Sequence, residues 1–478
     1  MEEINLDEIK AKTTTNILFL SLRNIAIQAI SFLGFFLLTI LLKKEEIGLF
    51  SLIVEIIGIL GYFSDIGLAA ALIQQKETVT KEELRTTFFI QQTLVALSLI
   101  VFWSFFYKSV ASSLFLAIAL CFSYVCASLK TIPSVLLERK LNFKILSMVD
   151  IAENTSFYLI AVILAFSGLG IQSYAWAVIF RSLLGLVWLY HASPWPIGFA
   201  FSVKAIKKLF RFGIPFQLNS FIAVVKDRIP NVLVAKYIGL SSFGLLSWAQ
   251  KGPRAPLSFM DAIQRVTFPT FARLQDNRDL LAASIKKSLF FIALFIFPAL
   301  AGIALIAPNV VHLIPKYTKW EPAILPLYFY SISFAIAAVT TPLTNAFNAV
   351  GKITITTALM IMWTVLTWIF YPFLSLRFNY MGTASAALIV GASSFIVWYI
   401  ARRLFHFSPL KTIFHPLFAC LIMIIVAFPI NRLIPQYLPN FIAKILISGG
   451  SYCLYQWLFC RQEINWFIKQ LKCYLVKK

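Results

Sequence analysis

Long apolar stretches follow one another along almost the whole chain. Most are about 20 residues or more in length, which is what an α-helix rising about 1.5 Å per residue needs to cross a hydrocarbon core about 30 Å thick. The pattern therefore predicts an all-α membrane protein with about fourteen transmembrane helices. We expect these spans near residues 14–42, 47–74, 85–106, 110–129, 145–167, 169–190, 209–237, 242–272, 285–310, 322–350, 353–376, 381–401, 412–431 and 438–460.

The eighth span carries polar side chains at helical spacing. If the segment is one helix, a single stripe at i, i+4, i+7, i+11, i+14 and i+18 contains Ser247, Lys251, Arg254, Ser258, Asp261 and Arg265. Each charge placed in lipid costs about 2.5–3.5 kcal/mol on insertion scales, so the stripe is expected to face protein or water. Asp261 and Arg265 can neutralise each other, but Lys251 and Arg254 have no acid at pairing distance on this helix. A transport path is the favoured interpretation, and structural pairing is the alternative.

An internal repeat relates this span to the second one. The segment Ile47–Leu52 aligns with Phe243–Trp248 at an offset of 196 residues. The same offset pairs Ser51 with Ser247, Glu55 with Lys251, Gly58 with Arg254, Tyr62 with Ser258 and Asp65 with Asp261. Because a repeat of six helices keeps its orientation, it predicts two six-helix lobes related by an axis along the membrane normal, with two helices appended. The predicted parts are an N-terminal lobe (1–190), a C-terminal lobe (191–405), helices 13 and 14 (406–460) and a basic cytoplasmic tail (461–478).

Other spans also contain polar groups. In the first, Arg23 lies next to a face at i, i+4 and i+7 that consists of Asn24, Gln28 and Ser31. In the fifth, Asp150 and Glu153 form an acidic patch, which Arg181 of the sixth span could neutralise.

The seventh span contains Asp227 between two basic neighbours, just before Pro230. Pro230 removes a helix hydrogen bond and is expected to open the backbone there. Asp227 is the best inward-facing candidate, because its repeat partner Ser31 lies on the polar face of the first span. Near the start of the fourteenth span, Lys444 is expected to snorkel towards the membrane surface.

The charge distribution indicates the topology. The chain has 42 Lys and Arg against 20 Asp and Glu, a net charge of +22, and a mean hydropathy of +0.82. The basic residues gather in alternate loops, such as 204–211 and 402–411, whereas the intervening loops hold far fewer. This positive-inside bias places both termini of a multi-pass protein in the cytoplasm. It also accounts for the basic excess without a nucleic-acid partner.

No catalytic or metal-binding motif is present. The sequence has no phosphate-binding loop, no zinc pattern among its six Cys and four His residues, and no nucleophile with a base at readable spacing, so no cofactor and no enzyme activity are expected. The loops are too short for the external domain that a membrane-embedded glycosyltransferase or polymerase commonly carries. Transport would use an ion gradient or substrate flux, and the carboxylates that could couple it are Asp65, Asp150, Glu153, Asp227 and Asp261.

Several segments carry a family resemblance. The stretches Ile47–Ser51, Phe63–Gln74, Phe212–Pro215 and Tyr237–Leu240 resemble polysaccharide-export flippases, the lipid-linked oligosaccharide branch of the multidrug, oligosaccharidyl-lipid and polysaccharide exporter superfamily. The resemblance implies two six-helix lobes around a central cavity with alternating access across the bacterial inner membrane. It implies flipping of an undecaprenyl-pyrophosphate-linked sugar repeat unit. Contact with the polysaccharide polymerase machinery is a further expectation.

The polar residues fit such a substrate. A pyrophosphate is matched by cations, and sugars need hydrogen-bonding side chains. The expected phosphate-binding residues are Arg23, Lys251, Arg254 and Arg265, and the expected glycan-facing residues are Asn24, Gln28, Ser31, Tyr62 and Ser258, with Glu55 on the sister stripe. A multidrug or organic-cation exporter of the same superfamily is the rival hypothesis. It would favour an acidic and aromatic lining, whereas bases here are at least as numerous as acids.

Overall fold

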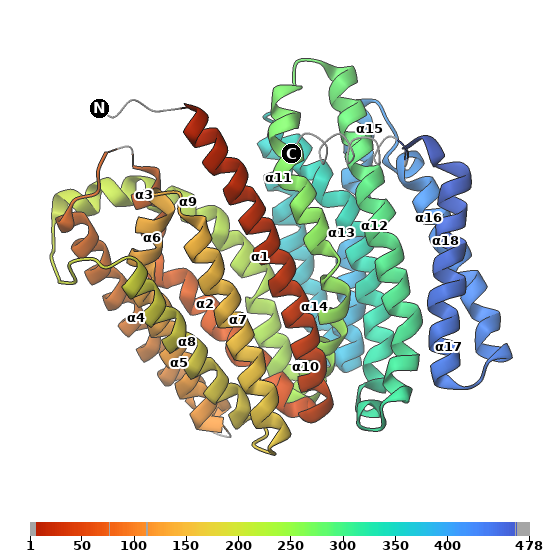
Figure 1. Cartoon of the computed structure of the whole chain (residues 1–478), viewed down its shortest axis with the longest axis horizontal. Coiled ribbons are helices and arrows are strands. Elements are labelled where there is room, and N and C mark those ends of the chain that lie inside the picture. The colour runs from red at the N-terminus through yellow and green to blue at the C-terminus, as the bar shows by residue number, and fades with distance from the viewer. Residues whose placement is uncertain (1–5, 76, 111–112, 464, 466–478) are drawn as a thin grey trace. The chain divides into compact units, whose positions relative to one another are not determined.

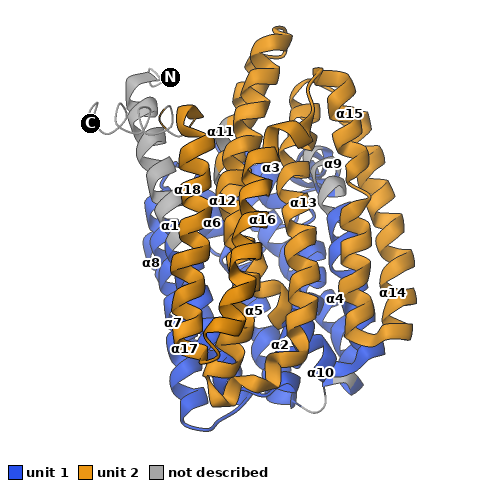
Figure 2. Ribbon diagram, turned by 90° about the vertical axis from the view of Figure 1, so that its right-hand side faces the viewer, with its two compact units in different colours: residues 1–247 blue, residues 248–478 orange. Residues whose placement is uncertain are grey.

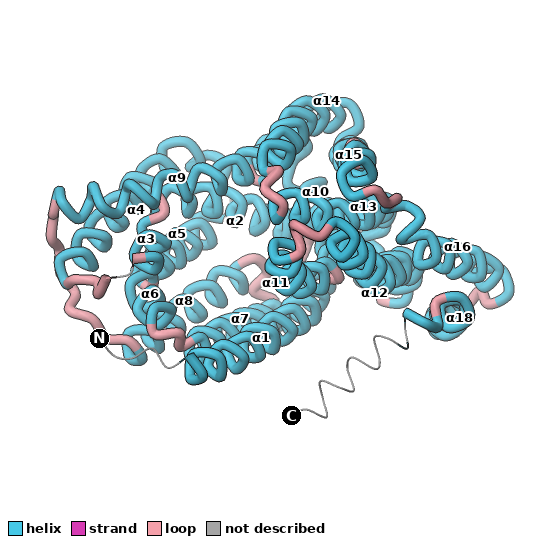
Figure 3. The backbone as a smooth tube through the Cα atoms, turned by 90° about the horizontal axis from the view of Figure 1, so that it is seen from above, coloured by secondary structure: helices cyan, strands magenta, loops and turns pink. Residues whose placement is uncertain are grey.

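The described part of the chain is all-α, as the apolar pattern predicts. The computed structural model describes residues 6–75, 77–110, 113–463 and 465, and in these ranges helices are joined by short loops (Figures 1 and 3). Each of the fourteen predicted spans overlaps one or more helices. Among the described residues, ten helices are long and apolar enough to cross a membrane. The number fourteen therefore stays a prediction.

The helices fall into two compact units, residues 1–247 and 248–478 (Figure 2). Those that lie wholly within unit 1 are α1 (Leu6–Leu41), α2 (Lys44–Asp65), α3 (Leu68–Gln74), α4 (Lys81–Val110), α5 (Leu114–Leu129), α6 (Thr131–Arg139), α7 (Phe143–Phe166), α8 (Gln172–Ala192) and α9 (Val203–Asp227). Helix α10 (Ile229–Arg254) begins in unit 1 and ends in unit 2. Within unit 1, α7 packs between α1 and α8, and α2 packs on α4 and α5. The predicted lobes at 1–190 and 191–405 remain a prediction.

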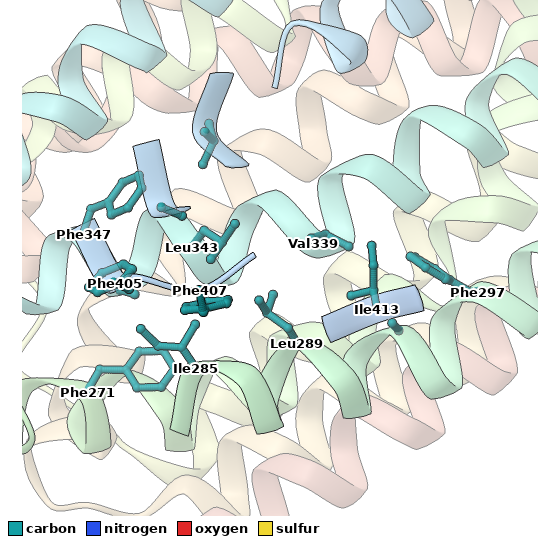
Figure 4. Packing of buried hydrophobic residues seen from close by; sticks show 14 of the residues in the cluster. Phe271, Ile285, Leu289, Phe297, Val339, Leu343, Phe347, Phe405, Phe407 and Ile413 are labelled. Atoms are coloured by element: carbon teal, nitrogen blue, oxygen red, sulfur yellow. The ribbon is translucent and has the colours of Figure 1, made fainter. Parts of the chain in front are cut away.

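Unit 2 is built around the long helix α12 (Arg278–Leu313). Its further elements are α11 (Leu257–Arg273), the 3-10 helix η2 (Pro315–Ala323), α13 (Ile324–Ala349), α14 (Ile353–Ala392), α15 (Phe395–Phe405), α16 (Pro409–Leu433), α17 (Tyr437–Ala443), the π-helical turn η3 (Lys444–Ser448) and α18 (Gly449–Phe459). Helix α12 packs against α11, α13 and α16. Figure 4 shows the resulting core, in which Leu289 of α12, Leu343 of α13 and Phe407 of the α15–α16 loop lie in one cluster.

The predicted polar-stripe helix is divided in two. Helix α10 ends at Arg254 and α11 begins at Leu257, so Ser247 to Arg265 do not lie on one continuous helix. Pro253 and Pro256 cause the break, because neither residue has an N–H to donate to the preceding turn. Helices α9 and α10 meet at Arg228, where Pro230 predicts an opening, but the backbone stays helical there: the Arg228 N–H donates to the Val224 carbonyl oxygen at 3.0 Å, and its own carbonyl oxygen accepts from Val232 at 3.2 Å.

Two repeat-related glycines pack against each other. A Cβ on Gly48 of α2 would overlap the carbonyl oxygen of Leu240, and a Cβ on Gly244 of α10 would overlap that of Lys44. Each glycine thus meets the residue four positions before the other, and the two are related by the offset of 196 residues. This reciprocal contact fits the predicted internal repeat, and it explains why both positions lack a side chain.

Candidate functional site

Glu55 of the second span forms a charge cluster that the sequence did not predict. The Arg228 guanidinium donates to Glu55 Oε2 at 3.1 Å, and the Asn231 amide donates to Glu55 Oε1 at 3.4 Å. The guanidinium lies against Gly58, where any side chain would overlap it. Gly58 therefore leaves the space through which Arg228 reaches Glu55. Arg228 is 173 positions away in sequence, so helical spacing gave no signal for this pair.

One turn further along α2, Tyr62 joins this helix to α9. Its hydroxyl donates to the Gln217 carbonyl oxygen at 2.6 Å, and the Gln217 amide donates to the Tyr62 carbonyl oxygen at 3.1 Å. The Tyr62 ring also packs on Phe221, with 5.6 Å between the ring centroids. The expected glycan-facing hydroxyl of Tyr62 is thus engaged with the backbone in this conformation.

The polar face of α1 contacts the acidic patch of α7. Arg23 donates to Asp150 Oδ2 at 2.9 Å and to Asn24 Oδ1 at 3.1 Å. Gln28 is exposed and Ser31 is half-buried on the same helix. An expected phosphate-binding cation and an expected coupling carboxylate therefore neutralise each other here.

Glu153, the second acid of the patch, is paired with Lys130 of the α5–α6 junction. Its side chain is buried and lies against Gly185 of α8. The hypothesis that Arg181 neutralises this patch is wrong for Glu153, since the Arg181 guanidinium lies 5.5 Å from the Phe157 ring centroid instead. A cavity of about 290 Å³ is bordered by Lys130, Asp150 and Glu153.

Two further coupling candidates have different surroundings. Asp65, the last residue of α2, accepts from the backbone N–H of Ala69 at 3.1 Å and from the side-chain amide of the buried Gln91. It therefore caps the start of α3. Asp227 is exposed and forms an ion pair of 2.7 Å with its neighbour Lys226.

Unit 2 holds the remaining stripe residues. Lys251 and Arg254 are exposed at the end of α10. The Ser258 hydroxyl donates to the carbonyl oxygen of Ala255 at 2.8 Å, next to the helix break. The side chains of Asp261 and Arg265 lie outside the described residues.

Lys444 does not snorkel. It is buried, and its ammonium donates to Asn309 Oδ1 at 2.6 Å and to the carbonyl oxygen of Leu305 at 3.1 Å. Asn309 in turn donates to Asn440 Oδ1 at 2.8 Å. These bonds fix the η3 turn to α12. Two asparagines inside apolar spans were the signal in the sequence that could have predicted this buried network.

The described residues include no cluster of three or more His, Cys, Asp or Glu residues that could hold a metal ion. The described cysteines, Cys121, Cys126, Cys420, Cys453 and Cys460, are free thiols. Four of them are buried, and Cys453 is exposed.

Helices that are long and apolar enough to span a membrane define a polytopic membrane protein, and charge pairs between such helices mark candidate functional sites. Residues 37–325, more than half of the chain, match the model of a family described as polysaccharide biosynthesis protein. The chain belongs to this family.

Curated relatives cover most of the chain at low identity. An uncharacterized membrane protein in the cps region of Klebsiella pneumoniae is 24% identical over 474 residues, which cover 93% of this chain and 95% of the relative. The lipopolysaccharide biosynthesis protein WzxC of Escherichia coli (strain K12) is 22% identical over 366 residues, 73% of this chain and 72% of the relative.

A solved structure has the same fold. The lipid II flippase MurJ in an inward closed conformation aligns with a TM-score of 0.72 over 93% of this chain and 99% of its own, at 15% sequence identity. At this identity the likeness shows the fold, and it agrees with the all-α membrane architecture described above.

Proposed function

We propose that the protein flips an undecaprenyl-pyrophosphate-linked oligosaccharide, a repeat unit of a surface polysaccharide, across the bacterial inner membrane by alternating access. Family membership and the relatives named for polysaccharide biosynthesis support this function. The observation that carries it is the pair of exposed cations Lys251 and Arg254, one turn apart at the end of α10. Cations at this spacing match the two phosphates of a pyrophosphate.

The proposed binding site contains two groups of residues with different chemistry. Cations bind the pyrophosphate, and neutral polar groups bind the glycan. The phosphate-binding residues are Arg23, Lys251, Arg254 and Arg265, and the glycan-binding residues are Asn24, Gln28, Ser31, Tyr62 and Ser258, with Glu55 on the sister stripe. The positive charge of the first group favours an anionic cargo over the organic cations of a multidrug exporter.

Ion coupling follows from competition for Arg23. In the described structure its guanidinium is bound to Asp150. When the substrate phosphate takes Arg23, Asp150 loses its cation and becomes available to a coupling proton or metal cation. The other proposed coupling carboxylates are Glu153, Asp65, Asp227 and Asp261. Both termini lie in the cytoplasm in this proposal, and the polysaccharide polymerase machinery is the partner that receives the flipped unit.

The test is flipping by the purified protein in proteoliposomes. A lipid-linked oligosaccharide with a labelled sugar is placed in the membrane, and its accessibility to an external quencher is followed with time. The double variant K251Q/R254Q is expected to lower the initial rate by about 100-fold, because it removes two charge-assisted contacts worth about 1.5 kcal/mol or more each.

The matched control is R377Q/R432Q, which removes the same charge from two exposed arginines elsewhere in unit 2. It is expected to flip at the wild-type rate. A K251Q/R254Q protein that incorporates normally and flips as fast as this control would refute the assigned phosphate site. Transport of an organic cation in place of the lipid-linked oligosaccharide would support the multidrug function instead.

A further inference from the structure

A basic pocket lies where α15 turns into α16, and none of its lining residues is among those proposed above to bind substrate. The cavity has a volume of about 650 Å³. Its lining includes Lys286 of α12, Arg402 of α15, Lys411 of α16 and the loop residues His406, Phe407 and Ser408. Among the described residues, no carboxylate lines it. In the described part of the chain, Lys286, Arg402 and Lys411 have no acidic partner within 4.0 Å.

The corner that forms this pocket is well defined. Helix α15 ends at Phe405, and the left-handed backbone of the next residue, His406 (φ 53°), turns the chain. Ser408 then caps α16, with its hydroxyl accepting from the backbone N–H of Lys411. Phe407, between these two residues, is buried in the unit 2 core beside Ile285 (Figure 4). The loop is therefore fixed by its own aromatic residue rather than being free to collapse into the cavity.

The charges around the cavity all favour an anion. The Lys286 ammonium lies 5.6 Å from the Phe407 ring centroid, on the inner wall of the pocket. Lys411 and Arg402 are exposed on the two helices that meet at the corner. The first turn of α16 adds the partial positive charge of a helix N-terminus. Like charges held this close repel one another, and a bound phosphate group relieves the repulsion.

An exposed apolar face continues from the pocket along α16. Lys411, Phe414, Phe418 and Leu421 lie at i, i+3, i+7 and i+10, so they share one side of the helix. The three apolar side chains on this face are exposed, and the rings of Phe414 and Phe418 stack with centroids 5.7 Å apart. A ligand with a phosphate head and hydrocarbon tails fits both features at once, whereas a soluble phosphate uses only the pocket.

We propose that this pocket binds the phosphate group of an anionic glycerophospholipid, with its acyl chains along the Phe414 and Phe418 face of α16. Basic pockets between membrane helices are known to bind such headgroups on the cytoplasmic side. The positive-inside bias of the sequence predicts that this corner faces the cytoplasmic leaflet. The bound lipid contacts α12, α15 and α16 and stabilises their packing at the membrane surface.

The test measures lipid binding to the purified full-length protein. Delipidated protein is titrated with phosphatidylglycerol or with zwitterionic phosphatidylethanolamine, and the bound lipids are counted by native mass spectrometry. Wild-type protein is expected to prefer phosphatidylglycerol by at least about tenfold. The triple variant K286Q/R402Q/K411Q is expected to lose this preference.

Two matched variants keep the result interpretable. K352Q/R377Q/R432Q removes three exposed cations elsewhere in unit 2 and is expected to keep the preference. K286R/K411R keeps the charge and is expected to bind like wild type, which separates loss of charge from a folding defect. Equal phosphatidylglycerol binding by the pocket triple variant and the control triple variant overturns the proposal. Displacement of the lipid by millimolar inorganic phosphate overturns the assignment to a lipid, because it identifies a site for soluble phosphate.

Discussion

The two compact units contain equal numbers of basic residues but compensate them differently. Residues 1–247 hold 21 Lys and Arg with 15 Asp and Glu, whereas residues 248–478 hold 21 Lys and Arg with only 5 acids. In unit 1, carboxylates pair with Arg23, Lys130, Lys208 and Arg228. In unit 2, five acids cannot neutralise most of the cations. Cations therefore join helices through ion pairs in unit 1, whereas most cations of unit 2 cannot be neutralised by acids of their own unit.

Cations of unit 1 are also compensated by backbone carbonyl oxygens, which adds to the difference between the two units. Arg139 of unit 1 donates to the backbone carbonyl oxygens of Leu72, Gln75 and Glu77, at the end of α3. Lys208 binds both Glu77 and Glu83, which raises the pKa of its ammonium. These charges of unit 1 are thus part of its internal structure, and neutralising them is expected to reduce stability. Neutralising the pocket cations of unit 2 is expected to affect ligand binding.

The largest effect is expected at Lys130. Replacing it with Met leaves the buried Glu153 carboxylate without its cation, which costs about 3–5 kcal/mol when one partner of a buried pair is removed. Thermal unfolding of the purified protein in detergent should show a clearly lower midpoint. The control is K140M, which removes an exposed lysine one helix further along. The double variant K130M/E153Q should recover much of the loss, and a K130M midpoint equal to that of K140M would contradict the role given to this pair.

An intermediate effect is expected at Gly58. In G58A the new methyl group displaces the Arg228 guanidinium from Glu55, and we expect a loss of about 1–3 kcal/mol for a hydrogen bond to a charged group. The matched control is G61A, whose methyl group would lie 4.0 Å from the Tyr124 ring, an ordinary contact. Since G58A and R228Q act on the same pair, their effects on unfolding should not add. Full additivity in the double variant would mean that Gly58 acts independently of Arg228.

The smallest effect is expected in unit 2, with the opposite sign. In lipid-free detergent, K286Q/R402Q/K411Q should unfold at the wild-type midpoint or slightly above it, by up to about 0.5 kcal/mol, because repulsion among exposed like charges is removed. Added phosphatidylglycerol should stabilise the wild type but not the variant. A marked loss of stability without lipid would show that these cations are structural, like those of unit 1. It would contradict the proposed difference between the two units.

The apolar pattern predicted the fold well because membrane helices are specified by length and hydrophobicity alone. It could not predict where helices break. Pro230 lies at the boundary between α9 and α10, but the backbone there stays helical, whereas Pro253 and Pro256 were overlooked within a run that otherwise has helical spacing. Gly239, where the backbone leaves helical geometry inside α10 (φ 79°), carries no such signal in a chain with 19 glycines.

The candidate site was predicted less completely, for a different reason. Helical spacing locates residues that share a face, and it marked Arg23 and Glu55 as candidate substrate-binding residues. It does not identify partners on other helices, such as Asp150 for Arg23 or Arg228 for Glu55. Lys444 was expected at the membrane surface because it lies near the start of the fourteenth span. Its partner Asn309 lies 135 positions away, so helical spacing could not identify it. Such pairings arise only when the helices are assembled.

The reciprocal contact of Gly48 and Gly244 also bears on how the chain arose. When residue i contacts j and j contacts i, the contact is isologous, as in a dimer of identical subunits with twofold symmetry. The two glycines meet in this manner although they now belong to one polypeptide. A pair of identical six-helix ancestors joined at this crossing would have needed only one glycine in one gene. If the predicted repeat arose by duplication and fusion of such an ancestor, both copies of that glycine would have to persist, while the charges on either side could change.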